Sequence, residues 1–266
     1  MAIPKINDLD NKQWKDYGDI LTDSLWLINR RDNTGSHAPD YWGNYIPQIP
    51  HQMMRRYTRK GDWVLDPFLG SGTTLIEAQR MGRHGLGVEL QPRVAELAKE
   101  RIQAEKNPHS VKAEIAVGDS SSFNFKKHLG KLGVKSVQLA MLHPPYFDII
   151  QFSEDQRCLS NASDIDSFLE SMRKVVAGCN SVLDPGRFLC LVIGDKYAKG
   201  EWIPLGFLTM QVVQEAGFTL KSIVVKNFEE TAGKKGAQQL WRYRALVGGF
   251  YVFKHEYVFV FQKNRR

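Results

Sequence analysis

Residues 62–74 read DWVLDPFLGSGTT, and this stretch decides the fold. Its first residues form a short apolar run, which predicts a buried strand that ends at Asp66. The glycines that follow allow a tight turn and a close approach of a ligand to the backbone, and a helical pattern begins at Ser71. A strand, a glycine-rich turn and a helix in this order predict a nucleotide-type site, because the start of the helix offers free N–H groups.

The details of this turn exclude three familiar sites. A phosphate-binding P-loop needs a lysine after its last glycine, but Thr73 follows Gly72. The dinucleotide pattern G-x-G-x-x-G lacks its third glycine here, and Gly70-Ser71-Gly72 does not have the G-x-S-x-G spacing of a serine hydrolase. The ligand is therefore expected to be a nucleoside of another kind.

Two acids beyond the turn fit a nucleoside. Glu89 ends the next predicted strand, about 20 residues after the turn, where a ribose-hydroxyl acceptor belongs. Asp119 follows the third predicted strand and could accept a hydrogen bond from an adenine amine. One such acid alone would be read as a helix cap. Together with Asp66, however, these acids stand at the ends of successive strands, which predicts a shared site.

The rest of the chain continues the alternation of strands and helices. Seven strands are predicted, at residues 63–66, 84–90, 111–117, 136–142, 187–193, 219–225 and 257–261. Helices are predicted at residues 51–58, 71–81, 93–106, 163–183 and 204–216. This order predicts an α/β fold with a mainly parallel sheet and helices on both faces. The last two strands have no clear helix between them and are expected to pair antiparallel. No linker divides residues 1–266, so a single domain is expected.

Composition narrows the class of protein. With 266 residues, 42% hydrophobic and 24% charged, the chain is a globular protein and not a disordered, collagen-like or small disulfide-linked one. No apolar run approaches the length of a membrane span, and the first residues lack a signal-peptide pattern. The three cysteines have no C-x-x-C spacing. We therefore expect a cytoplasmic protein with reduced thiols, no metal and no membrane contact.

Charge favours a polyanionic partner. The chain has 36 Lys and Arg against 29 Asp and Glu, a net charge of +7, and phosphate contacts need surplus basic residues. Residues 226–254 hold six basic residues and two Glu among several aromatic ones. Such a segment is either a solvated loop or a basic-aromatic insertion that recognises nucleic acid. The candidate nucleic-acid contacts are Arg30, Arg31, Lys234, Lys235, Trp241, Arg242 and Arg244.

Two motifs resemble one enzyme family. Residues 66–74, DPFLGSGTT, closely resemble the cofactor motif of the amino-methylating DNA methyltransferases, which use S-adenosylmethionine to methylate adenine N6 or cytosine N4. The second signature of that family is Asp, Asn or Ser before Pro-Pro-aromatic, and residues 143–146 read HPPY after the fourth predicted strand. The resemblance extends over roughly residues 20–262 and includes Gly194-Asp195 and residues 255–261. It implies a Rossmann-like methyltransferase fold, with a mostly parallel seven-stranded sheet and an antiparallel last strand.

The resemblance also implies site residues. Cofactor binding would involve Asp66, Pro67, Phe68, Gly70, Ser71, Gly72, Thr73, Thr74, Glu89 and Asp119. Residues 46–50 resemble the segment that closes over the methionine part of the cofactor, so Pro47 is a further candidate, and residues 1–50 are expected to close over the cofactor and to contact DNA. Catalysis would fall to His143, Pro144, Pro145 and Tyr146.

Methyl transfer to an amine requires the protein to place the amine in line with the methyl group and to exclude water. A base must leave the duplex to reach such a site, and Tyr146 offers it a flat face. His143 departs from the family pattern, which has Asp, Asn or Ser at this position. Only a neutral histidine can accept a hydrogen bond from the amine, because a protonated imidazole has no free lone pair. Cytosine-C5 methylation is disfavoured because no cysteine follows a proline.

The expected function is site-specific methylation of double-stranded DNA, with adenine N6 slightly ahead of cytosine N4. An RNA base-amine methyltransferase and a cofactor-binding, non-catalytic subunit remain as alternatives. No separate recognition domain stands out in the sequence. The terminal segment and residues 226–254 are therefore expected to read the target, or a second subunit assists, and a restriction enzyme is a possible partner.

Overall fold

The computed structural model describes residues 5–228 and 238–265. Within these ranges the strands are β1 (Leu25–Trp26), β2 (Trp63–Asp66), β3 (His84–Glu89), β4 (Ala113–Val117), β5 (Val137–Leu142), β6 (Leu183–Ile193), β7 (Lys196–Ala198), β8 (Glu201–Ile203), β9 (Phe218–Asn227) and β10 (His255–Lys263). The α-helices are α1 (Gln48–Tyr57), α2 (Thr73–Arg80), α3 (Pro92–Ala104), α4 (Phe125–Lys131), α5 (Ile165–Val182), α6 (Leu205–Glu215) and α7 (Gln238–Gly248). Short 3-10 helices are η1 (Asn11–Asp16), η2 (Phe147–Ile149) and η3 (Leu159–Asn161).

The main sheet has the order β1-β9-β10-β6-β5-β2-β3-β4. From β4 to β6 all neighbours are parallel, whereas β10 is antiparallel to both β6 and β9. This confirms the predicted α/β fold with one antiparallel strand near the end of the chain. The expected count of seven strands is exceeded by β1, two residues of the N-terminal segment that pair with β9. A separate hairpin of β7 and β8 follows β6.

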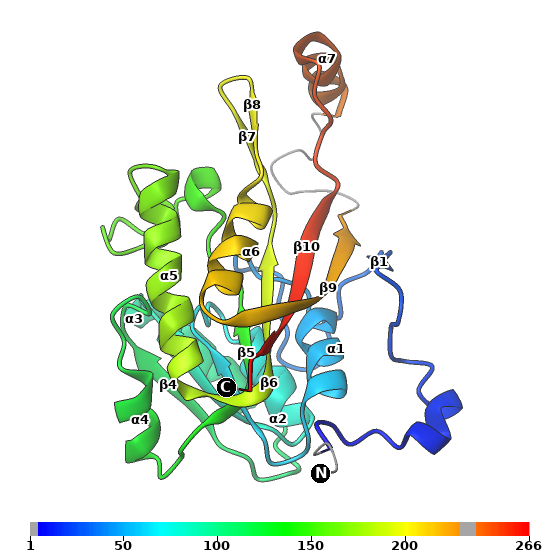
Figure 1. Ribbon diagram of the computed structural model, residues 1–266, viewed down its shortest axis with the longest axis vertical. Helices are drawn as coiled ribbons and strands as arrows, with labels where there is room; N and C mark the ends of the chain where they lie inside the picture. Colours follow the sequence, from blue (N-terminus) through cyan, green and yellow to red (C-terminus); the bar gives the residue numbers. More distant parts are fainter. Residues whose placement is uncertain (1–4, 229–237, 266) are drawn as a thin grey trace.

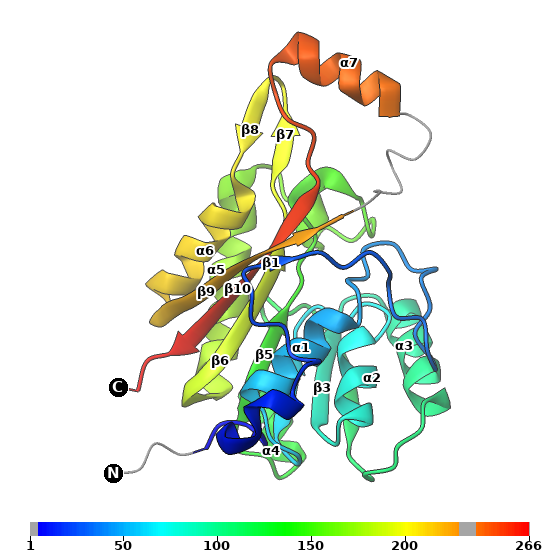
Figure 2. The same cartoon turned by 90° about the vertical axis from the view of Figure 1, so that its right-hand side faces the viewer.

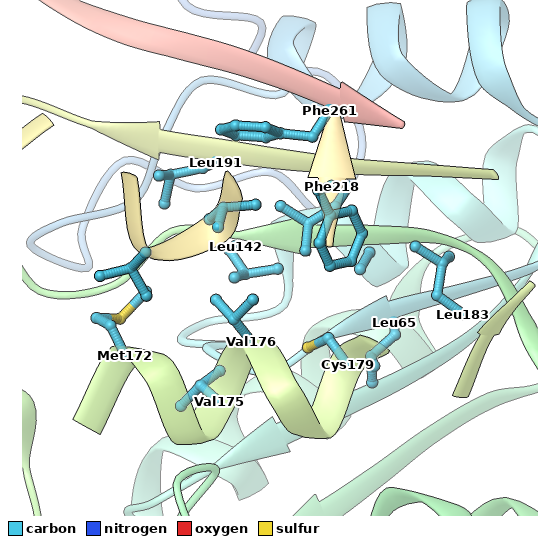
Figure 3. Close-up of a cluster of buried hydrophobic side chains, with 14 of the residues drawn as sticks. Leu65, Leu142, Met172, Val175, Val176, Cys179, Leu183, Leu191, Phe218 and Phe261 are labelled. Atoms are coloured by element: carbon cyan, nitrogen blue, oxygen red, sulfur yellow. The ribbon is translucent and has the colours of Figure 1, made fainter. Parts of the chain in front are cut away.

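Helices cover both faces of the sheet, α1, α2 and α3 on one and α4, α5 and α6 on the other (Figures 1 and 2). Alternation along β5 explains this, because Leu139 and Met141 pack under α1 while Ala140 and Leu142 pack under α5. Figure 3 shows the core on the face covered by α5, where side chains of this helix such as Val176 pack against buried strand residues. The sheet thus has a core on each side and leaves the carboxyl ends of its strands open.

Three helices differ from the sequence prediction. The prediction of no clear helix within residues 226–254 is wrong, since α7 lies there. Its apolar residues gave no core-facing pattern because most of them stay exposed: Leu240, Tyr243, Leu246 and Val247. The helix α4 was also missed, although the Asn124 side chain caps it by accepting from Lys127 N–H at 2.9 Å. Helix α1 begins before residue 51, since Pro50 in a first turn removes no helical hydrogen bond.

Helix α7 and the β7–β8 hairpin extend beyond the body of the domain, past the carboxyl ends of the parallel strands (Figures 1 and 2). Aromatic pairs join the hairpin to the segment after α7. Tyr197 stacks on Phe250 with 4.1 Å between ring centroids, and Trp202 lies against Phe253 at 4.2 Å. The two projections therefore form one structure above the sheet. No helix in the described part of the chain is long and apolar enough to cross a bilayer.

Candidate active site

One cavity of about 900 Å³ lies over the carboxyl ends of the parallel strands. Its walls include the residues that follow β2, β3, β4, β5 and β6, namely Pro67, Leu90, Gly118, His143 and Gly194. Because these strands run in the same direction, their ends meet along one edge of the sheet, where ligands bind in open α/β folds. The two motifs found in the sequence therefore open into the same space.

The glycine turn and two acids form one half of the cavity. Phe68, Gly70, Thr73, Glu89 and Asp119 all line it, as the sequence predicted for cofactor contacts. Gly70 has φ +53°, and a Cβ there would lie 3.3 Å from the ring of a tyrosine in the N-terminal loop. A side chain at this position would thus crowd the turn and its neighbour.

The two acids are held by backbone N–H groups. Glu89 is buried, and its carboxylate accepts from Gly70 N–H at 3.0 Å and from Gln91 N–H at 2.9 Å. Burial raises the pKa of Glu89 above its ordinary value despite these hydrogen bonds. Asp119 accepts from the N–H and hydroxyl of Ser121, at 2.9 and 2.8 Å. Both carboxylates are thereby fixed in orientation at the cavity wall.

Other residues of the glycine motif lie behind the turn and do not line the cavity. Asp66 is 1% exposed. Its carboxylate accepts from Phe68 N–H at 2.9 Å and from the Thr74 hydroxyl, which also contacts the Tyr45 hydroxyl. Burial raises the pKa of Asp66 to about 7. Gly72, with φ +95°, faces α3, where a Cβ would lie 3.3 Å from Ala98. These residues brace the turn.

Ser71 and Pro47 also lie outside the cavity wall. The Ser71 hydroxyl donates to Asn44 Oδ1 at 2.7 Å, and Pro47 is buried at the start of α1. Ile46, the first residue of the segment expected to close over the cofactor, lines the cavity, and the chain before it adds Tyr41, Trp42 and Asn44. Nothing in the sequence motif marks these three residues.

The N-terminal loop is pinned to α2 by a buried carboxylate. Glu77 Oε1 lies 2.8 Å from His37 Nε2, and its Oε2 lies 2.9 Å from His51 Nδ1. Burial opposes ionisation of Glu77, but the two histidine hydrogen bonds outweigh it and lower its pKa to about 2. The loop that carries the cavity-lining residues is thus tied to the helix that follows the glycine turn.

The HPPY motif forms the other half of the cavity, and all four of its residues line it: His143, Pro144, Pro145 and Tyr146. His143 Nε2 lies 3.1 Å from the Tyr146 hydroxyl, which donates to Glu256 Oε2 at 2.8 Å. The other oxygen, Glu256 Oε1, lies 3.0 Å from Lys226 Nζ. A continuous chain of polar contacts thus runs from the histidine to a buried ion pair.

Lys226 and Glu256 were not among the predicted site residues. They are directly opposite each other in the β9–β10 register and are 5% and 4% exposed. The sequence predicts Lys226 at the start of the basic insertion, but the residue belongs to β9 and faces the cavity. One feature of the sequence could have indicated this pair. Glu256 directly precedes the apolar run of residues 257–261, and a charge on a buried strand needs an oppositely charged partner.

The surroundings of His143 favour its neutral form. Burial lowers its pKa to about 4, with Glu256 acting to raise it and Lys226 to lower it. The Tyr45 ring packs edge-on against the imidazole, with 4.7 Å between centroids. The requirement that the histidine be unprotonated if it is to accept a hydrogen bond is therefore met.

Asp195, just after β6, also lines the cavity. Its carboxylate accepts from Gly206 N–H at 2.9 Å and from Trp202 Nε1 at 3.0 Å. It thereby joins the start of α6 to the β7–β8 hairpin. Trp241 of α7 lines the outer part of the same cavity.

The remaining basic candidates are divided between surface and interior. Arg30, Arg242 and Arg244 are exposed, and the Arg244 guanidinium lies 5.3 Å from the Trp241 ring centroid. Arg31 instead turns inward and donates to the Tyr45 carbonyl at 2.9 Å, so its observed role is to hold the N-terminal loop. Lys234 and Lys235 lie outside the described residues.

Comparison with known families follows from these two motifs. The chain matches the model of a protein family that is described as DNA methylase and named for N6 and N4 methyl transfer. The match covers residues 4–100 and 137–266. The chain belongs to this DNA methylase family. Both the glycine turn and the HPPY motif fall within the matched residues.

Individual relatives match shorter stretches. The chain is 36% identical over 81 residues to the type II methyltransferase M.MjaII of Methanocaldococcus jannaschii, covering 29% of this chain and 15% of the relative. It is 33% identical over 89 residues to M2.DpnII of Streptococcus pneumoniae, covering 27% of this chain and 33% of the relative. The matches thus span a third or less of these relatives.

A solved structure shares the fold. TrmN from Thermus thermophilus superposes with a TM-score of 0.51 at 20% identity, covering 82% of this chain and 49% of that one. This likeness shows a Rossmann-like methyltransferase fold. S-adenosylmethionine is the cofactor, and the glycine-turn half of the cavity suits it, since two fixed carboxylates and an aromatic ring face that space. In the described residues no cluster of three or more His, Cys, Asp or Glu could hold a metal.

Proposed function

We propose that this DNA methylase transfers a methyl group from S-adenosylmethionine to an exocyclic amine of a base in double-stranded DNA, with adenine N6 ahead of cytosine N4. The observation that carries the proposal is the single cavity shared by the glycine turn and the HPPY motif. A donor and an acceptor bound in its two halves would lie side by side, which supplies most of what an in-line transfer needs.

In the cofactor half, Glu89 would accept from the ribose hydroxyls and Asp119 from the adenine amine. Phe68 offers a flat apolar face, and Gly70 and Thr73 bring backbone close to the ligand. The bound cofactor supplies an electrophilic methyl group. Pro67 lines the same half of the cavity. Support comes from residues behind the turn, for which we propose an indirect role: Asp66, Ser71, Gly72, Thr74 and Pro47.

In the target half, His143 would accept a hydrogen bond from the amine of an extruded base and aim the nitrogen lone pair at the methyl group. Pro144 and Pro145 keep this turn rigid, and Tyr146 lies where a base could stack. The new N–C bond would form as the methyl group leaves the donor sulfur, which keeps the bonding electron pair. The amine would lose one proton in the transfer, and neutral His143 can hold that proton.

Contact with DNA would come from α7 and the N-terminal segment. Arg242 and Arg244 are exposed beside Trp241, which suits phosphate contact next to a stacking ring. The helix contains no acid. Its position at the outer end of the cavity would place it against duplex flanking an extruded base. We propose that α7 and Arg30 read the target sequence, alone or together with a second subunit or restriction partner.

The test is methyl transfer by the purified chain. Duplex DNA and an RNA of the same sequence would be incubated with labelled S-adenosylmethionine, digested to nucleosides and separated by mass. The proposal expects N6-methyladenine in DNA and loss of transfer in His143→Ala. Label confined to RNA would instead make it an RNA methylase. Calorimetric binding of the cofactor without any transfer would make the chain a non-catalytic subunit.

A further inference from the structure

We propose that Glu256 is a positioning residue that acts through Tyr146 to fix the tautomer of His143, leaving Nδ1 as the hydrogen-bond acceptor for the target amine. This inference rests on the proposed function and extends it. It concerns a carboxylate on β10 that lies 110 residues beyond the motif tyrosine in the chain and contacts it directly.

The tautomer follows from counting protons. A phenol has one O–H, and a carboxylate can only accept. The Tyr146 proton therefore points to Glu256 Oε2 at 2.8 Å, and the Tyr146 oxygen turns a lone pair toward His143 Nε2 at 3.1 Å. Nε2 must then carry the hydrogen. A neutral imidazole has only one N–H, so Nδ1 keeps its lone pair.

The surroundings hold this arrangement. Lys226 Nζ lies 3.0 Å from Glu256 Oε1, so each carboxylate oxygen has its own partner. The absence of a side chain at Gly194 lets the Tyr146 ring approach the backbone, since a Cβ there would lie 3.1 Å from it. The groups that face His143 are Tyr45 edge-on, Tyr146, and the charges of Glu256 and Lys226.

The tautomer decides whether the site can function. Burial lowers the pKa of the His143 imidazole and favours its uncharged form at neutral pH. The variable is therefore which of the two ring nitrogens carries the hydrogen. If the Tyr146 proton turned toward Nε2, the hydrogen would move to Nδ1. The imidazole would then present a donor to the amine, which is itself a donor, and the amine nitrogen would lose its partner.

The substitution Glu256→Gln should cause this reversal. An amide has one oxygen, and the cationic Lys226 takes it, which turns the NH₂ group toward Tyr146. The phenol then accepts from the amide and donates to Nε2. We expect Glu256→Gln to reduce kcat on the order of 10- to 100-fold, as when a histidine loses the group that orients it, with unchanged KM for the cofactor. Two-bond ¹H–¹⁵N spectra should show the His143 hydrogen on Nδ1.

Removing the lysine as well should restore function. In the double variant Glu256→Gln with Lys226→Met, the amide oxygen is free to face Tyr146, so the wild-type tautomer and most of the turnover return. In a Tyr146→Phe background, Glu256→Gln should change kcat no further. Asp62→Asn is the matched control, because it breaks another buried carboxylate–cation pair, with Arg187, away from the cavity. It should lower stability and leave the tautomer alone.

The proposal is overturned if the His143 hydrogen stays on Nε2 in Glu256→Gln. It is also overturned if the lysine substitution lowers turnover further in place of rescuing it, or if the Tyr146→Phe and Glu256→Gln effects multiply. The spectra need neither cofactor nor DNA. They therefore test the tautomer even if the chain proves to methylate some other substrate or none.

Discussion

Replacing Asp66 by asparagine tests whether this acid binds the cofactor or braces the turn. The carboxylate is buried, accepts from Phe68 N–H and the Thr74 hydroxyl, and lies outside the cavity wall. Asparagine has the same shape, keeps one acceptor oxygen for Phe68, and can donate its NH₂ to the threonine oxygen. Asp66→Asn should therefore preserve the turn while removing the charge.

The magnitude follows from the pKa. Burial raises the pKa of Asp66 from 3.8 to about 7, so the folded protein holds a proton that the unfolded chain releases. Wild-type stability should fall as pH rises between these values and level off above the higher one. At about 1.4 kcal/mol per pH unit the loss is about 4 kcal/mol. In a domain of this size that shifts Tm on the order of 10 °C.

The assay is thermal unfolding of both proteins from pH 4 to 8.5, with cofactor affinity measured by calorimetry at each end. The variant should gain on the wild type steadily up to about pH 7 and then keep its advantage, with cofactor affinity within about threefold, since no hydrogen bond to the ligand is lost. A stability difference that is independent of pH would refute the protonated brace. Loss of cofactor binding in a folded variant would return Asp66 to the ligand contacts.

Four further outcomes are expected. Glu89→Ala should weaken cofactor binding in calorimetry by about 1–3 kcal/mol without preventing folding. Arg242→Ala with Arg244→Ala should weaken DNA binding and reduce its salt slope by nearly one unit per lost phosphate contact, with cofactor affinity unchanged. Turnover should stay flat between pH 6 and 8, because the pKa of His143 is lowered to about 4; an acid limb near 6.5 would show that the histidine is solvated. Gly72→Ala should lower the free energy of unfolding by about 2–4 kcal/mol, from a left-handed backbone and a methyl pressed on α3 at 3.3 Å, measured by urea unfolding.

The parts of the site that could be predicted from the sequence are those formed by contiguous motifs. A buried strand followed by DPFLGSGTT or HPPY fixes both a local turn and its place at the carboxyl edge of a parallel sheet. Glu89 and Asp119 could be added because Glu89 ends β3 and Asp119 follows β4 by two residues. Their common cavity then follows from the direction of the strands.

The parts that could not be predicted depend on pairing across long separations. Lys226 and Glu256 become partners only when β9 and β10 align, and neither residue has a motif around it. The same holds for Tyr41, which reaches the cavity through a loop without regular structure. Helix α7 escaped notice because its apolar side chains cover no core, so helical periodicity had no buried face to reveal.

The position of β10 has a consequence for how the protein is made. It is the last strand of the main sheet in chain order, yet it lies between β6 and β9. A chain still being synthesised therefore has two open sheet edges, whose backbone groups find partners only when this strand enters. Glu256 enters with it. A chain that ends before β10 could form the glycine turn and contain His143. It would lack the Glu256 carboxylate, which accepts a hydrogen bond from Tyr146. Closure of the sheet and formation of the Tyr146–Glu256 contact are thus a single event.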